Sequence, residues 1–228
     1  MRTLVFNGWA SGPEMWEAAR FPRERVFSYV DQLDGLPEAE MERSGDAILV
    51  GFSMGGSTAL RMLLGWPGKV RGLVLVSTTP CMMERKAEGW RAMSERRLAA
   101  LRMGTLISIP EMHVASELFD EAQLDRGLEY LRSTDLRRRL LDFARGDAGR
   151  RFSSSPVEVV QSVRDGIVRP SNAEFLKSVF PQARVTMVPG GEHSLPATVP
   201  DLVARAVIGC QVAAAGGTEG KECCGHEA

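Results

Sequence analysis

Long apolar runs, a strong net charge and a dense set of cysteines are all missing from this 228-residue chain. Because no stretch approaches the 18 or so apolar residues that a membrane-spanning helix needs, the sequence predicts no transmembrane segment. A formal net charge of −1 provides no general attraction to nucleic acid or to an anionic membrane surface. The opening residues MRTLVFNGWA enter a predicted core strand at once, which leaves no room for a signal peptide.

Cysteine is scarce, with four residues in the whole chain: Cys81, Cys210, Cys223 and Cys224. Two of them are adjacent, and their spacing matches neither a disulfide framework nor a zinc site. We therefore expect a cytoplasmic protein that holds no metal and needs no cofactor.

What the chain does contain is an alternation of short apolar segments with helical patterns. Six segments are β-branched or apolar with little alternation, as strands covered on both faces should be, at 3–7, 25–30, 47–52, 72–77, 157–163 and 184–188. Helical patterns lie between them, notably at 57–65, 172–180 and 202–209. This order predicts an α/β fold with a mostly parallel central sheet flanked by helices.

One region interrupts the alternation and sets the predicted domain boundaries. Residues 82–155 are rich in arginine and helical in pattern, which predicts a short helical cap inserted above the carboxyl edge of the sheet. Residues 1–81 and 156–210 would then form the core, and 211–228, small and polar, a disordered tail.

The strongest chemical signal is Gly51-Phe52-Ser53-Met54-Gly55, between a predicted strand and a predicted helix. A G-x-S-x-G sequence at such a junction indicates a nucleophile elbow, in which a sharp turn exposes the serine hydroxyl. The turn also directs the Met54 N–H toward a developing oxyanion. The alternative is an ordinary turn that happens to contain serine, because glycine is frequent in this chain.

A serine nucleophile needs a base and a carboxylate to orient that base. Of three histidines, His113 falls in the predicted cap and His226 in the tail, whereas His193 follows the last predicted strand. Asp165 follows the preceding strand, so the order Ser53, Asp165, His193 is that of an α/β-hydrolase. Three other carboxylates are rivals that fall before or within that strand: Asp142, Asp147 and Glu158. The Trp9 N–H, in the loop after the first strand, is the predicted second oxyanion donor.

Together these segments resemble the α/β-hydrolase superfamily, and within it the pimeloyl-[acyl-carrier protein] methyl ester esterases of biotin synthesis. The similar segments, spread over about residues 3–205, are LVFNGWASGPEMW, LVLVSTTPCMMERKAEGW, LAALRMGT, RGLEYLRSTDLRRRL and RDGIVRP. The chain departs from the family at Asn7, where histidine is usual, in its shorter cap and around PGGEHSLP.

The resemblance implies a serine carboxylesterase that hydrolyses the methyl ester of a pimeloyl chain carried by an acyl carrier protein. Ser53, His193 and Asp165 would be catalytic, the Trp9 and Met54 N–H groups would form the oxyanion hole, and the substrate pocket would be lined by Trp9, Phe52, Met54 and Cys81. For the last three, simple core packing is an equal alternative.

Charge in the predicted cap bears on the carrier protein. Residues 84–102 hold six basic and three acidic side chains, and residues 126–151 hold eight and four. Because acyl carrier proteins are acidic, such a surface would speed their encounter with the enzyme; a solvated helix face is the alternative. Arg96 stands where the family has a carrier-contacting arginine, with Arg97 and Arg102 beside it. Two other functions stay open: a short-chain esterase or thioesterase without a carrier partner, and a ligand-binding protein that does not catalyse.

Overall fold

A computed structural model describes residues 1–9, 11, 13–21, 26–43, 45–80, 125–127, 129–130, 136–190 and 193–216. These residues form a six-stranded sheet in the order β2-β1-β3-β4-β5-β6, with every neighbouring pair parallel. The strands are β1 (Arg2–Phe6), β2 (Val26–Phe27), β3 (Ala47–Phe52), β4 (Val70–Val76), β5 (Val157–Ser162) and β6 (Arg184–Val188). The predicted mostly parallel α/β fold is confirmed, and each observed strand overlaps a predicted one.

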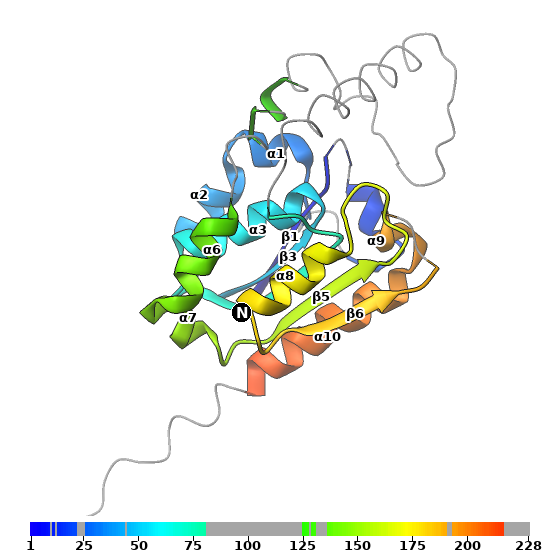
Figure 1. The fold of residues 1–228 in the computed structure, drawn as a ribbon. Helices are drawn as coiled ribbons and strands as arrows, with labels where there is room; N and C mark the ends of the chain where they lie inside the picture. Colours follow the sequence, from blue (N-terminus) through cyan, green and yellow to red (C-terminus); the bar gives the residue numbers. More distant parts are fainter. Residues whose placement is uncertain are drawn as a thin grey trace, which may run out of the picture.

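Helices cover both faces of the sheet (Figure 1). One face packs against α3 (Met54–Gly65), α6 (Leu136–Arg145), α7 (Asp147–Phe152) and α8 (Ser171–Val179). The other packs against η1 (Pro13–Trp16), α9 (Leu195–Thr198) and α10 (Pro200–Gly216). Two apolar clusters result, one on each side of the sheet, which is why β3 and β5 are buried along their whole length.

Two short helices, α1 (Tyr29–Leu33) and α2 (Leu36–Arg43), follow the edge strand β2. The α1 helix begins with a capping box, in which the Ser28 hydroxyl accepts from the Asp31 N–H and the Asp31 carboxylate accepts from the Ser28 N–H. Among the described residues, none of the helices has both the length and the apolar character required to cross a bilayer.

The structure differs from the predicted boundaries at two places. Helices α6 and α7 lie inside the segment predicted as a cap, yet Leu136, Leu140 and Phe152 are buried in the apolar cluster under α3 and α8. Helix α10 continues to Gly216, so the tail predicted from residue 211 starts six residues too early. The Gln211 amide of that last part donates a 2.9 Å hydrogen bond to the Thr3 hydroxyl on β1.

Candidate active site

The turn between β3 and α3 places Ser53 in an uncommon backbone conformation. Its φ is 53°, in the left-handed region that side chains other than glycine rarely adopt. The Ser53 N–H donates to the Val76 carbonyl at 2.9 Å, which ties the turn to β4. A Cβ atom at Gly51 or Gly55 would collide with backbone, that of Gly56 and of Phe6 respectively. Both motif glycines are therefore required because chain segments pass too close for a side chain.

Three side chains far apart in the sequence meet at the carboxyl edge of the sheet. His193 Nε2 lies 2.9 Å from Ser53 Oγ, and His193 Nδ1 lies 2.9 Å from Asp165 Oδ2. All three residues are buried, with exposed fractions of 2% for Ser53 and 7% for Asp165 and His193. Because a carboxylate only accepts hydrogen bonds, His193 Nδ1–H donates to Asp165, which leaves Nε2 to accept the Ser53 O–H. The predicted spatial grouping of Ser53, Asp165 and His193 is present.

The Asp165 carboxylate is held by four donors. Its Oδ1 accepts from the Ile167 and Val168 N–H groups at 2.8 and 2.7 Å. Its Oδ2 accepts from His193 and from the Gln161 side-chain amide, the latter at 3.1 Å. Burial acts to raise the pKa of Asp165, but the hydrogen bond and charge of His193 and the two N–H groups outweigh it, so the pKa lies below its ordinary 3.8.

This lowered pKa predicts how stability depends on pH. Between the folded and the unfolded pKa of Asp165, the unfolded chain binds more protons, so the free energy of unfolding rises with pH there. The contribution is complete above about pH 5 and is lost as pH falls through the unfolded and then the folded pKa of Asp165. We expect the urea midpoint of unfolding of Asp165→Asn to be lower than that of the wild type at pH 7. The gap between the two midpoints should narrow as the pH is lowered toward 3. A gap that stays constant over this range would contradict the assignment.

Sequence reasoning missed a residue that fixes the histidine loop. Ser77, just past β4, has a φ of 46° and is fully buried, and its hydroxyl donates to the His193 carbonyl at 2.9 Å. Phe52 packs beside the same histidine, with ring centroids 5.1 Å apart. Gln161 was also missed, although a glutamine that directly follows Val159 and Val160 in a predicted buried strand is a readable sign of a buried polar contact.

The two predicted oxyanion donors come from the residue after Ser53 and from the loop after β1. Met54 is the first residue of α3, and Trp9 follows β1, where its indole stacks on Tyr29 with centroids 6.1 Å apart. Asn7 shapes the loop that leads to Trp9. Its side-chain oxygen accepts from the Gly8 N–H at 3.0 Å and from the Trp16 indole N–H at 3.2 Å, and its carbonyl accepts from the Gln32 side chain. An amide at this position thus organises the loop from inside.

The rival carboxylates lie elsewhere and have other partners. Glu158 pairs with Arg184 across β5 and β6 at 2.8 Å, Asp147 pairs with Arg150 on α7, and Asp142 lies 4.0 Å from Arg138 on α6. Several predicted residues fall outside the described part of the chain: His113, His226, Cys81, Arg96, Arg97 and Arg102.

Comparison with known proteins identifies the family of the chain and its fold. A pimeloyl-[acyl-carrier protein] methyl ester esterase of Yersinia enterocolitica is 28% identical over 188 residues, covering 71% of this chain and 68% of its own. One of Aromatoleum aromaticum is 27% identical over 234 residues, covering 80% and 86%. A thermophilic esterase from Thermogutta terrifontis has a similar fold, with a TM-score of 0.69, 20% identity and coverage of 94% and 90%. The sequence model of the alpha/beta hydrolase family matches residues 5–206, and the chain belongs to that family.

Proposed function

We propose that this protein is a serine carboxylesterase with Ser53 as nucleophile, His193 as base and Asp165 as the carboxylate that orients the base. The observation that carries the proposal is the continuous hydrogen-bonded series from Ser53 through His193 to Asp165. A serine hydroxyl is a poor nucleophile by itself, and this series gives its proton a place to go as the ester is attacked.

The reaction proceeds in two halves. Ser53 Oγ attacks the ester carbonyl while His193 Nε2 takes the hydroxyl proton, and the resulting imidazolium is stabilised by the Asp165 carboxylate. As the tetrahedral intermediate collapses and its C–O bond to the alkoxide breaks, His193 gives the proton to the alkoxide, which departs as an alcohol and leaves the acyl group on Ser53 Oγ. In the second half His193 removes a proton from water, the hydroxide attacks the acyl group, and Ser53 regains its proton as the carboxylic acid is released.

The oxyanion of each tetrahedral intermediate needs hydrogen-bond donors that are fixed before the reaction. The N–H groups of Met54 and Trp9 fill this role in the proposal. Met54 opens α3, so its N–H points out of the helix amino terminus, where the aligned peptide dipoles favour negative charge. Asn7 and Gln32 hold the backbone that precedes Trp9. Phe52, Trp9 and Met54 would also border the acyl group.

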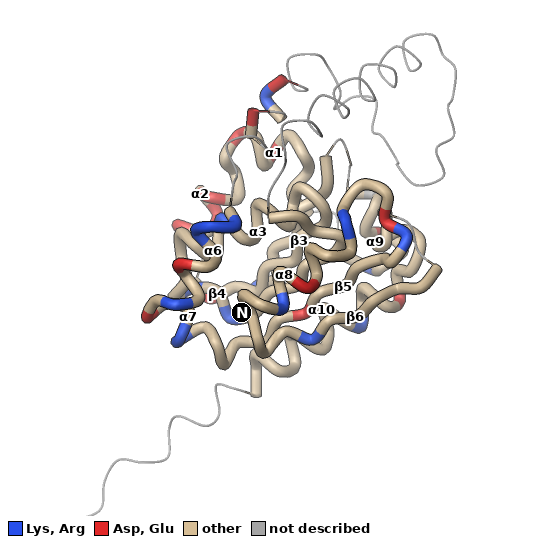
Figure 2. The backbone as a smooth tube through the Cα atoms, in the orientation of Figure 1, with Lys and Arg blue, Asp and Glu red and all other residues tan. Residues whose placement is uncertain are grey.

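As substrate we propose the methyl ester of a pimeloyl chain on an acyl carrier protein. The support is the name shared by the relatives quoted above, together with a basic surface that suits an acidic carrier. Helices α6 and α7 carry six arginines and two aspartates (Figure 2). The first residue of α6 donates its N–H to the Pro80 carbonyl just past β4, so α6 begins near the edge that holds Ser53, whereas α7 lies beside the amino end of β4.

A comparison of substrates tests the proposal. Methanol release from the carrier-bound methyl ester should have a higher kcat/KM than hydrolysis of p-nitrophenyl butyrate. The kcat/KM for the carrier-bound ester should fall as salt is added, because salt screens the charges on the enzyme and the carrier. Arg139 lies on the exposed side of α6, and Arg139→Glu should lower kcat/KM for the carrier-bound ester only. The control is Arg71→Gln, at an arginine paired with Asp46, which should leave the kcat/KM values for both esters unchanged.

Other outcomes contradict the proposal in distinct ways. Equal, salt-independent kcat/KM values for the two esters would instead favour an esterase or thioesterase without a carrier partner. If no ester were turned over and a fluorophosphonate failed to label Ser53, the protein would be a ligand-binding member of the fold.

A further inference from the structure

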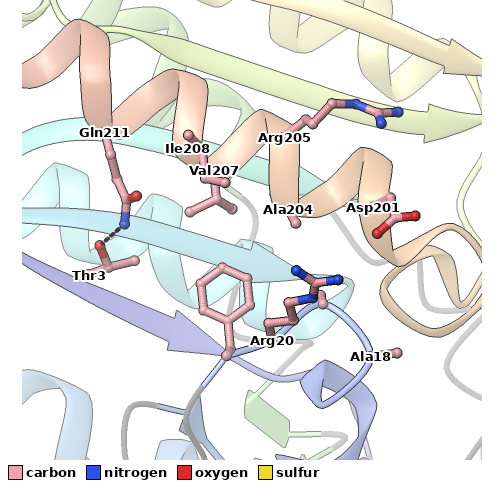
Figure 3. A pocket seen from close by; sticks show the side chains of 11 residues that line it. Thr3, Ala18, Arg20, Asp201, Ala204, Arg205, Val207, Ile208 and Gln211 are labelled. Atoms are coloured by element: carbon pink, nitrogen blue, oxygen red, sulfur yellow. Dashed lines mark hydrogen bonds between the residues drawn. The ribbon is translucent and has the colours of Figure 1, made fainter.

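A cleft lies within the layer that η1 and α10 form on one face of the sheet, and none of its lining residues belongs to the proposed catalytic site. It encloses about 410 Å³ between the turn after η1 and helix α10 (Figure 3). This volume is within the usual range for small-molecule sites. Its walls are partly apolar, with Phe21 from the turn and Val207 and Ile208 from α10.

The turn that forms one wall is a complete Schellman motif with an unexpected residue. The Phe21 N–H donates to the Trp16 carbonyl at 3.2 Å, and the Arg20 N–H donates to the Glu17 carbonyl at 2.9 Å. The apolar contact that accompanies this motif is also present, since the Phe21 and Trp16 rings meet edge to face at 5.5 Å. In this motif Arg20 occupies the position that glycine usually fills, because its φ is positive, at 61°.

An arginine at this position strains the backbone, so its side chain needs a compensating role. The motif's hydrogen bonds are all made by the backbone, and glycine would make them equally well. The Arg20 side chain instead extends into the cleft toward α10 (Figure 3). The Arg20 guanidinium forms no ion pair with any described acidic residue, including Asp201, which also lines the cleft.

We propose that this cleft binds a monoanionic aliphatic carboxylate, with the Arg20 guanidinium on the carboxylate and the chain against Phe21, Val207 and Ile208. A planar guanidinium matches a carboxylate with two parallel hydrogen bonds. The charged lining residues are Arg20, Arg205 and Asp201, a net charge of +1 that suits one negative charge better than the two of a phosphate monoester. At the far end of the cleft the Gln211 side-chain amide donates to the Thr3 hydroxyl oxygen at 2.9 Å, which ties α10 to β1 beside the apolar wall.

The sharpest test is Arg20→Gly, because ligand binding and stability should change in opposite directions. Sodium octanoate titrated into the full-length protein, followed by calorimetry, should bind at least about tenfold more weakly to the variant. The variant's Tm should rise by about 2–4 °C, since glycine removes the backbone strain. Hydrolysis of p-nitrophenyl butyrate should be unchanged, because no residue that lines the cleft belongs to the proposed catalytic site.

Further controls separate the two parts of the ligand. Acetate lacks the chain and octanol lacks the charge, and each should bind at least about tenfold more weakly than octanoate. Ile208→Glu, at a side chain that is 56% exposed, should weaken octanoate binding by charge repulsion without unfolding the protein, whereas Arg43→Gln, outside the cleft, should not. The proposal is overturned if Arg20→Gly keeps the wild-type affinity, if it lowers Tm, or if the wild type does not bind octanoate. None of these results depends on whether Ser53 is catalytic.

Discussion

Ser53→Ala is expected to reduce ester hydrolysis by at least about 10⁴-fold, because no other group supplies the nucleophile. Alanine has nearly the same backbone preferences as serine, so the strain at a φ of 53° is the same in both proteins. The variant loses only the hydroxyl that contacts His193 Nε2. Its Tm should therefore stay close to that of the wild type, and initial rates with p-nitrophenyl butyrate alongside a thermal melt measure the two quantities.

Ser57→Ala is the matched control. Ser57 lies one helical turn further along α3, is also buried, and donates its hydroxyl to the Thr79 carbonyl at 2.8 Å. Removing this hydrogen bond should cost about 1 kcal/mol of stability while leaving turnover within a few-fold of the wild type. Ser53→Ala should thus lose activity but keep its stability, whereas Ser57→Ala should lose stability but keep its activity. A folded Ser53→Ala protein that retained substantial esterase activity would refute the proposed nucleophile.

The parts of the site that the sequence predicts well follow from short-range patterns and strand order. The elbow is local, since Gly51, Ser53 and Gly55 lie between an apolar strand and a helical pattern. Asp165 and His193 could be located because each follows a predicted strand, and the carboxyl ends of parallel strands share one edge of the sheet. No knowledge of side-chain contacts was needed to place these three residues together.

The supporting hydrogen bonds could not be predicted in this way. Ser77 and His193 are 116 positions apart, and their contact requires β4 and the loop after β6 to approach across an intervening strand. The sequence around Ser77 shows only the end of an apolar strand. Helix boundaries failed for a different reason: the apolar periodicity of α10 fades in the alanine-rich stretch 211–216, where high helix propensity continues the helix.

Among glycine-to-alanine substitutions at the described glycines near Ser53, we expect Gly55→Ala to lower the free energy of unfolding most. A Cβ at this position would collide with the carbonyl groups of Phe6 and Asn7, which are backbone and have no rotamer to change. We expect a loss of more than about 3 kcal/mol, in line with other severe overpacking. For a chain of this size that corresponds to a fall in Tm of about 6–12 °C, measurable by calorimetry.

Gly65→Ala tests whether the effect comes from the close approach or simply from replacing a helical glycine. Gly65 ends the same helix, and a Cβ there would meet nothing within 4 Å, so alanine should be neutral or stabilise by up to about 1 kcal/mol. The clash at Gly55 can be relieved only by moving α3, which begins beside Ser53, or the end of β1, which leads through Asn7 to Trp9. Either movement changes the distance between Ser53 and the proposed Trp9 oxyanion donor, so kcat should fall in any Gly55→Ala protein that still folds. Equal Tm values and equal kcat values for the two alanine variants would show that α3 and β1 do not need this close contact.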